Sequence, residues 1–161
     1  MTRTGLRRWI AGVIATSGIF WWAAPAANAA ETVQSFAVNA TVNADGSLQV
    51  ASTLTFDGAP PATLTQALAI RVRTADSYEY RFQIANVAVT SNGQALPAQV
   101  DAGADATTVS VDTAGVTGPI EIGYTVVGAA MPTANDTTTI AWALLQGLNV
   151  PVAAVDATTA A

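Results

Sequence analysis

Hydrophobic and polar residues alternate along most of the chain after residue 31, with the period of two that is typical of half-buried β-strands. The pattern is clearest in residues 33–43 and 47–56, which Asp45 and Gly46 separate. An Asp-Gly pair between two alternating segments is a strong signal for a tight β-hairpin. Ser52 is the one polar residue in the apolar phase of these two strands. The apolar positions of that phase are Phe36, Val38, Ala40, Val42, Leu48, Val50, Leu54 and Phe56.

Similar patterns predict strands in the rest of the chain. Asn86 interrupts the alternation of its segment and indicates a bulge, and Asn92-Gly93 is a second hairpin signal. Pro97 restricts its strand to the edge of a sheet or to a bulge. The further strands are expected at 67–73, 78–90, 94–100, 108–112, 120–128 and 138–144.

Several segments between these strands are less regular. Residues 62–72 fit a helix as well as a strand, and β-branched residues favour the strand toward their end. Residues 57–61 and 74–77 read as turns, and 153–161 as a frayed tail of low complexity. Loops are expected at 101–107, 113–119 and 129–136.

Short strands at fairly regular spacing, with Gly, Asn and Asp between them, are typical of an antiparallel sandwich. The sequence therefore predicts an all-β, immunoglobulin-like, two-sheet β-sandwich of about 7–9 strands. The cysteine pair of true immunoglobulin domains is absent, since the chain has no cysteine. Residues 30–161 form this single predicted domain.

The first 29 residues have the pattern of a secretory signal peptide. Arg3, Arg7 and Arg8 form a basic start, an uncharged apolar stretch follows, and Ala27-Asn28-Ala29 resembles a cleavage site. We therefore expect signal-peptide cleavage and a secreted or extracytoplasmic protein of the cell envelope. No second apolar stretch long enough to span a bilayer follows residue 31.

Removal of residues 1–29 leaves a markedly acidic chain. Three of the six basic residues are lost, while all eleven acidic residues remain, so the net charge becomes −8. Such a charge opposes binding to nucleic acid or to anionic lipid surfaces. We expect no nucleic-acid partner and no membrane span in the mature chain.

The composition also argues against catalysis. The chain has no His, Cys or Lys, which removes the usual general bases, thiol nucleophiles and Schiff-base lysines. No phosphate-binding glycine motif is present. We therefore predict that the protein is not an enzyme, and we assign no catalytic, cofactor-binding or metal-binding residue, no cofactor and no small-molecule substrate.

Three groups of residues are candidate binding sites. Asp101, Asp105 and Asp112 lie close in sequence and carry the oxygen ligands that calcium prefers, although solvated loop acids are the simpler interpretation. Arg71 and Arg73 share a face and are expected to form surface ion pairs with Asp76 or Glu79. A sugar-binding face would need exposed aromatic residues, but the alternation places these in the core: Tyr78, Tyr80, Phe82, Tyr124 and Trp142.

The order of motifs resembles the N-terminal extracellular domain of the YciQ-like family, predicted bacterial membrane proteins of unknown function. The resemblance covers residues from about 32 to the end of the chain. It rests on the Asp45-Gly46-Ser47 hairpin, an Ile- and Tyr-containing strand at 120–128, and the spacing of Trp142, Gly147 and Pro151. It implies an extracellular domain and brings no known activity or site residue.

Two features depart from the family pattern. Ser52 stands where the family tends to carry an acidic residue, and residues 63–72 replace a Gly-Ile-x-Arg stretch. Family members also continue into membrane-spanning segments. We expect an exported, non-catalytic interaction or structural domain whose sheet edges, at the Pro97 strand and at the C-terminal end, contact an envelope or membrane protein. The alternative is a carbohydrate- or calcium-binding secreted domain.

Overall fold

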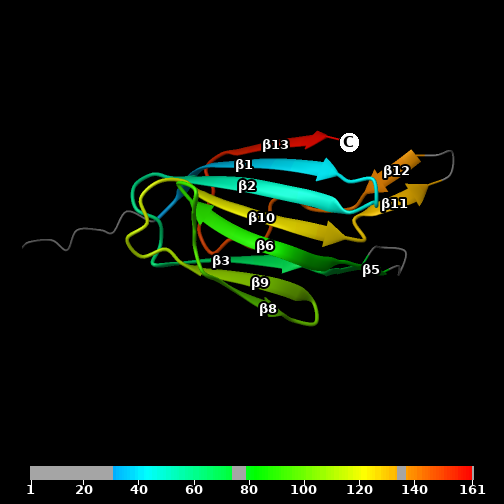
Figure 1. Ribbon diagram of the computed structural model, residues 1–161, viewed down its shortest axis with the longest axis horizontal. Helices are drawn as coiled ribbons and strands as arrows, with labels where there is room; N and C mark the ends of the chain where they lie inside the picture. Colours follow the sequence, from blue (N-terminus) through cyan, green and yellow to red (C-terminus); the bar gives the residue numbers. More distant parts are fainter. Residues whose placement is uncertain (1–30, 74–78, 134–136, 161) are drawn as a thin grey trace, which may run out of the picture.

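The computed structural model describes residues 31–160, apart from 74–78 and 134–136, and contains only β-strands (Figure 1). The predicted signal peptide and the turn at 74–77 lie outside the described residues. The strands are β1 (Val33–Val42), β2 (Leu48–Phe56), β3 (Thr63–Ala69), β4 (Arg71–Arg73), β5 (Glu79–Arg81), β6 (Gln83–Ser91), β7 (Gln94–Ala95), β8 (Ala98–Ala102), β9 (Ala106–Asp112), β10 (Ile120–Val127), β11 (Ala130–Thr133), β12 (Thr137–Ile140) and β13 (Val155–Ala160).

Two sheets form the body of the domain. The larger has the order β13-β1-β2-β10-β6-β7 and the smaller the order β3-β9-β8. Two short hairpins, β4–β5 and β11–β12, account for the other strands of the described residues. The predicted all-β sandwich is confirmed, and nine strands make up its two main sheets. The larger sheet is mixed rather than purely antiparallel, because β13 runs parallel to β1.

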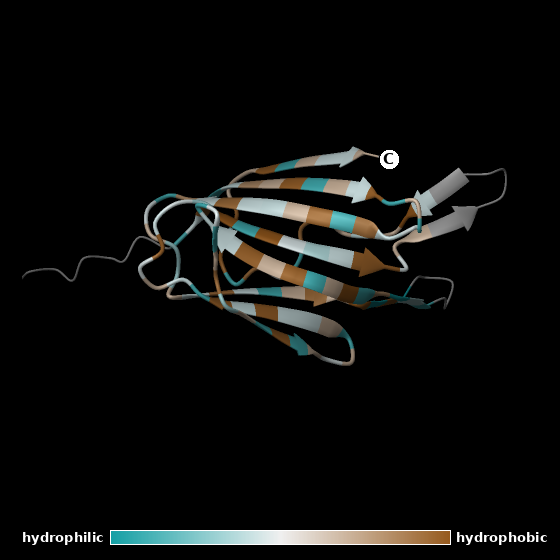
Figure 2. Ribbon diagram, in the orientation of Figure 1, coloured by the Kyte–Doolittle hydropathy of each residue, from teal (hydrophilic) through white to brown (hydrophobic). Residues whose placement is uncertain are grey.

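The core lies between the sheets and is built by the alternation seen in the sequence (Figure 2). Phe36, Val50 and Leu54 are fully buried, as the phase predicts. Tyr124 on β10 is also buried, at 1% exposure. Burial of such side chains contributes about 1.5–3 kcal/mol each, which makes this apolar layer the main stabilising element.

Ser52 is tolerated in the core because its hydroxyl has a partner. Its side chain is 2% exposed, and its Oγ donates a 3.0 Å hydrogen bond to the carbonyl oxygen of Ile122, the residue opposite it on β10. A buried hydroxyl without such a bond would be costly.

The two predicted hairpin turns and the predicted bulge are present. Asp45 accepts hydrogen bonds from the backbone and the hydroxyl of Ser47, which fixes the β1–β2 turn. Asn86 has a positive φ of 53°, and the register with β10 shifts there, as in a bulge. Asn92 and Gly93 both have positive φ, which suits the tight turn between β6 and β7.

Pro97 divides its predicted strand rather than only restricting it. Residues 94–100 become β7 in the larger sheet and β8 in the smaller one, so the chain crosses between sheets at Pro97. The prediction that this segment would lie at a sheet edge is confirmed, since β8 is an edge strand.

Four other boundaries were predicted wrongly. The strand expected at 138–144 is β12, which ends at Ile140, because its partner β11 begins at Ala130 opposite Ile140. The strand expected at 67–73 begins at Thr63 and is interrupted at Ile70. The Ile70 amide donates to the carbonyl oxygen of Asp105 and its carbonyl oxygen accepts from Phe82, so the backbone partner changes at this residue. Residues 130–133 form a strand rather than a loop, because they pair with 137–140. The tail expected to fray forms β13, because β1 offers a free edge for pairing.

Residues 146–154 connect the two sheets along one side of the sandwich. The carbonyl oxygen of Gly147 accepts a bond from the Ala67 amide of β3, and the Asn149 side chain bonds the backbone of Thr63 and Thr65. Further along, Ala153 donates to the carbonyl oxygen of Val33 on β1. In the described part of the chain, no helix is long and apolar enough to cross a membrane.

Gly147→Ala should strongly destabilise the domain. Gly147 has a φ of 46°, and a Cβ there would overlap the carbonyl oxygen of Ala67. Left-handed backbone costs about 1–2 kcal/mol, and forcing atoms into a packed contact costs about 1–3 kcal/mol more. Chemical unfolding should show that the free energy of unfolding falls by more than about 2 kcal/mol.

Gly115→Ala is the matched control for this prediction. Gly115 also has a positive φ, of 76°, but a Cβ there meets nothing within 4 Å. The Gly115→Ala variant should lose only about 1 kcal/mol of its free energy of unfolding, from the left-handed backbone alone. Equal losses in the two variants would show that the close contact of Gly147 with β3 does not matter.

Candidate functional site

The hairpin β4–β5 separates charged from apolar residues. In its register Arg71 pairs with Arg81, Val72 with Tyr80, and Arg73 with Glu79. Because side chains alternate across a strand, the charged residues share one face and Val72 and Tyr80 the other. The hairpin therefore presents two surfaces of opposite character.

Glu79 is the centre of the charged face. One carboxylate oxygen lies 2.8 Å from Arg71 Nε and 3.4 Å from Arg73 Nε, and the other lies 2.7 Å from Arg81 Nε. Arg71 also reaches Asp105 at 3.3 Å. The predicted pairing of Arg71 and Arg73 with Glu79 is confirmed, whereas Asp76 lies outside the described residues.

These contacts shift the pKa of Glu79. The hydrogen bond from Arg71 is the largest cause, and bonds from Arg81 and Arg73 add to it against partial burial. Together they lower the pKa of Glu79 from 4.5 to about 2. The pKa of Arg71 is raised in turn, mainly by its bond to Glu79.

The apolar face of the hairpin forms one wall of a pocket. The pocket has a volume of about 270 Å³, and its opposite wall is the segment 141–146. Aromatic rings dominate the lining, together with small aliphatic side chains and one amide. The lining residues are Ala69, Val72, Tyr80, Phe82, Ala141, Trp142, Ala143 and Gln146.

Trp142 packs against both the pocket and the core. Its ring centroid lies 5.2 Å from that of Phe82 at an interplanar angle of 85°, an edge-to-face contact. It also lies 6.3 Å from the ring of Tyr124. Burial raises the pKa of Tyr124, with a smaller opposing effect from the Trp142 indole. Phe82 and Tyr124 are core residues as predicted, whereas Trp142 and Tyr80 are only half-buried.

The one side-chain amide of the pocket, that of Gln146, already has hydrogen-bond partners within the protein. Gln146 Oε1 accepts a 2.7 Å bond from the Ala69 amide, and Gln146 Nε2 donates a 2.8 Å bond to the carbonyl oxygen of Ala143. These bonds hold the 141–146 wall against β3. The pocket is therefore suited to an apolar guest, since hydroxyl groups placed there would lose their hydrogen bonds to water.

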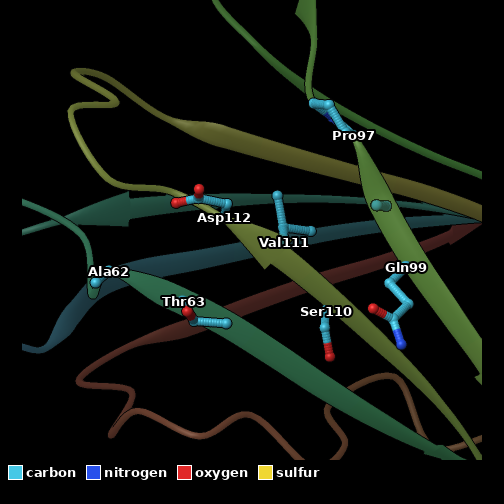
Figure 3. A pocket seen from close by; sticks show the side chains of 8 residues that line it. Ala62, Thr63, Pro97, Gln99, Ser110, Val111 and Asp112 are labelled. Carbon is cyan, nitrogen blue, oxygen red and sulfur yellow. The ribbon is translucent and has the colours of Figure 1, made fainter.

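A second and larger pocket, of about 560 Å³, lies at one end of the smaller sheet (Figure 3). Thr63, Gln99, Ser110 and Asp112 contribute its polar side chains. In Figure 3 the Ser110 and Gln99 side chains point to the same side of the sheet, as expected for paired residues of β9 and β8. No aromatic residue lines it.

These two pockets weaken the case for sugar binding. Protein sites for sugars combine an aromatic platform with side chains that bond hydroxyl groups. Here the aromatic pocket has an occupied amide, and the polar pocket has no aromatic residue. The two requirements are met in different places.

The three acidic residues that are candidate calcium ligands do not converge. Asp105 precedes β9 and Asp112 ends it, which separates them by about 23 Å at the usual rise of a strand. Asp101 accepts a hydrogen bond from Gln99, and Asp112 from the Ala114 amide. Among the described residues, no group of three or more acidic side chains could hold a metal ion.

Sequence reasoning did not find most of the residues that line the aromatic pocket. Trp142, Tyr80 and Phe82 were named, but Val72, Gln146 and the three alanines of the lining were not. The chain order gives no sign that residues 69–82 face residues 141–146. The only available signal was the concentration of every arginine after residue 30 within residues 71–81.

No protein-family model matches this chain, and no curated protein matches it significantly.

Glu79→Gln should reduce stability at neutral pH and flatten its acid dependence. Because the folded pKa of about 2 lies below the ordinary value of 4.5, Glu79 contributes stability above pH 4.5 that is lost as the pH falls toward 2. Urea unfolding at pH 7, 4.5, 3 and 2 should show a gap between the native chain and the variant that closes over this range.

Glu121→Gln is the control for this experiment. Glu121 is exposed, accepts a bond from Thr90 and has no arginine partner among the described residues. It should not change the pH dependence. A Glu79→Gln gap that stays constant from pH 7 to pH 2 would contradict the role given to the arginine contacts.

Proposed function

We propose that this protein is an exported, non-catalytic β-sandwich domain of the bacterial cell envelope that binds another envelope protein along the edge strand β13. The exposure of β13 is the observation that carries the proposal. All six of its residues are exposed, so the strand adds backbone to the larger sheet without adding to the core.

The edge formed by β13 is poorly protected against pairing. Natural edge strands are usually short, charged, bulged or interrupted by proline. β13 has six residues, and Asp156 is its one charged side chain. At the other edge of the same sheet, β7 has only two residues. β13 is therefore the edge of the larger sheet best suited to strand addition.

The hydrogen bonds to β1 define which groups of β13 remain available. Phe36 donates to the carbonyl oxygen of Ala154 and is in register with Val155. Since bonding alternates along a parallel ladder, the amides of Asp156 and Thr158 face β1. The amides of Val155, Ala157 and Thr159 face away from it, where a partner strand would bind.

The absence of catalytic groups supports a binding role. The chain has no His or Cys, and the acidic side chains around both pockets are bonded to arginines or to backbone and amide groups. The pattern of residues 1–29 supports export, and the order of motifs supports a relationship to the YciQ-like extracellular domains.

Ala157→Pro should abolish partner binding while leaving the fold intact. Proline removes one outward amide, which the ladder with β1 does not use. The experiment places a photo-reactive amino acid at Thr159 in the full chain, expressed in a bacterial host. A discrete adduct with an envelope protein, lost in the Ala157→Pro variant at unchanged melting temperature, is the expected result.

Thr158→Pro serves as the comparison. It removes an amide that faces β1, so it should lower the melting temperature by detaching β13. An adduct that persists in the Ala157→Pro variant would refute binding along this edge. Hydrolysis of peptidoglycan, polysaccharide or peptide by the pure protein would refute the non-catalytic assignment.

A further inference from the structure

The aromatic pocket lies next to the only positive charges of the chain after residue 30. That part of the chain has three arginines, no lysine and eleven acidic residues. Arg71, Arg73 and Arg81 all lie on the β4–β5 hairpin, whose other face lines the pocket. The one cluster of arginines after residue 30 thus lies on the hairpin that also lines the aromatic pocket.

Each arginine is a sequence neighbour of a pocket residue. Arg71 and Arg73 flank Val72, and Arg81 stands between Tyr80 and Phe82. The Arg73 and Arg81 side chains are 74% and 75% exposed, so both retain hydrogen-bond donors facing water. Their guanidinium groups lie on the charged face with Glu79, so binding an anion at the mouth of the pocket requires these two exposed side chains to turn around the edge of the two-stranded hairpin.

We propose that this pocket binds a single-chain anionic amphiphile, with its apolar tail between Trp142 and the β4–β5 hairpin and its carboxylate at Arg73 and Arg81. The site is a small-molecule site separate from the proposed protein-binding edge at β13. Either can therefore fail without the other.

The volume sets the length of the tail. A dry apolar cavity of about 150 Å³ is enough for benzene. The 270 Å³ of this pocket leave room for a chain of on the order of eight carbons. Each buried methylene should tighten binding about fourfold. Affinity should therefore rise from butanoate to octanoate and level off for longer chains.

The charge of the guanidinium groups sets the preference for the head group. Octanoate and octanol have tails of equal length, but only octanoate can accept charge-assisted hydrogen bonds from arginine. Octanoate should bind several-fold more tightly than octanol at low salt, and added salt should reduce the difference.

The single tryptophan of the pocket provides the readout. Trp9, Trp21 and Trp22 are the only other tryptophans in the sequence. In the full chain with these three replaced by phenylalanine, Trp142 is the sole fluorophore. Titration with butanoate, hexanoate, octanoate, decanoate and octanol should give saturable changes in its emission, with the chain-length and head-group dependence stated above.

Two variants locate the binding. Ala143→Phe fills the pocket from an exposed position and should weaken octanoate binding at least tenfold. Ala114→Phe adds the same ring at an exposed loop position outside the pocket and should leave binding unchanged. The double variant Arg73→Gln and Arg81→Gln should reduce the octanoate-to-octanol preference to about one.

Three results would overturn the proposal. The first is the absence of a saturable change in Trp142 emission with octanoate. The second is equal octanoate binding by the native chain and the Ala143→Phe variant, which would place the ligand elsewhere. The third is an octanoate preference that survives in the double arginine variant, which changes only exposed side chains and so remains informative if Ala143→Phe does not fold.

Discussion

The hydrogen bonds between residues 146–149 and β3 determine how the last part of the chain joins the smaller sheet to the larger one. Through them, an irregular segment acts as an additional strand of the smaller sheet before the chain crosses to β1. Side-chain amides of Gln146 and Asn149 replace backbone groups in this ladder, bonding Ala69, Thr63 and Thr65. Such substitution lets the segment follow β3 without regular strand geometry, because the amides of Thr65, Ala67 and Ala69 still find partners.

Both proposed surfaces depend on this closure. Preceding it, residues 141–146 form the wall that faces the β4–β5 hairpin and completes the aromatic pocket. Following it, Pro151 and Ala153 bond Val33 and direct the chain into β13. One short connection thus positions an apolar pocket at one end of its path and an exposed sheet edge at the other. The tight fit of Gly147 against Ala67 makes that connection sensitive to a single methyl group.

The parts of the fold that could be predicted from the sequence are those set by local chemistry. The alternation of Phe36, Val38 and Val50 identified the buried faces, because a half-buried strand has a fixed period of two. Asn86, Asn92 and Gly93 marked the bulge and the turn, because few residues adopt positive φ at low cost. These signals depend only on neighbouring residues.

The parts that could not be predicted depend on pairing between distant segments. The residues of β13 have little apolar character, and only the free edge of β1 makes them a strand. Similarly, the pocket joins residues 69–82 to residues 141–146, and each segment alone reads as a weak strand or a loop.

The clustering of arginines is the one feature of the candidate site that can be seen in the sequence. A scattered set of arginines would have been expected for solubility alone, whereas three within eleven residues share one carboxylate, that of Glu79. The three arginines outnumber their two acidic partners, Glu79 and Asp105, so ion pairing alone does not account for the cluster. A hairpin that turns its apolar face toward an aromatic pocket and its arginines toward solvent matches the two ends of an anionic amphiphile. Val72 and Tyr80 are not fully buried in the core, and this leaves them available to contact a ligand.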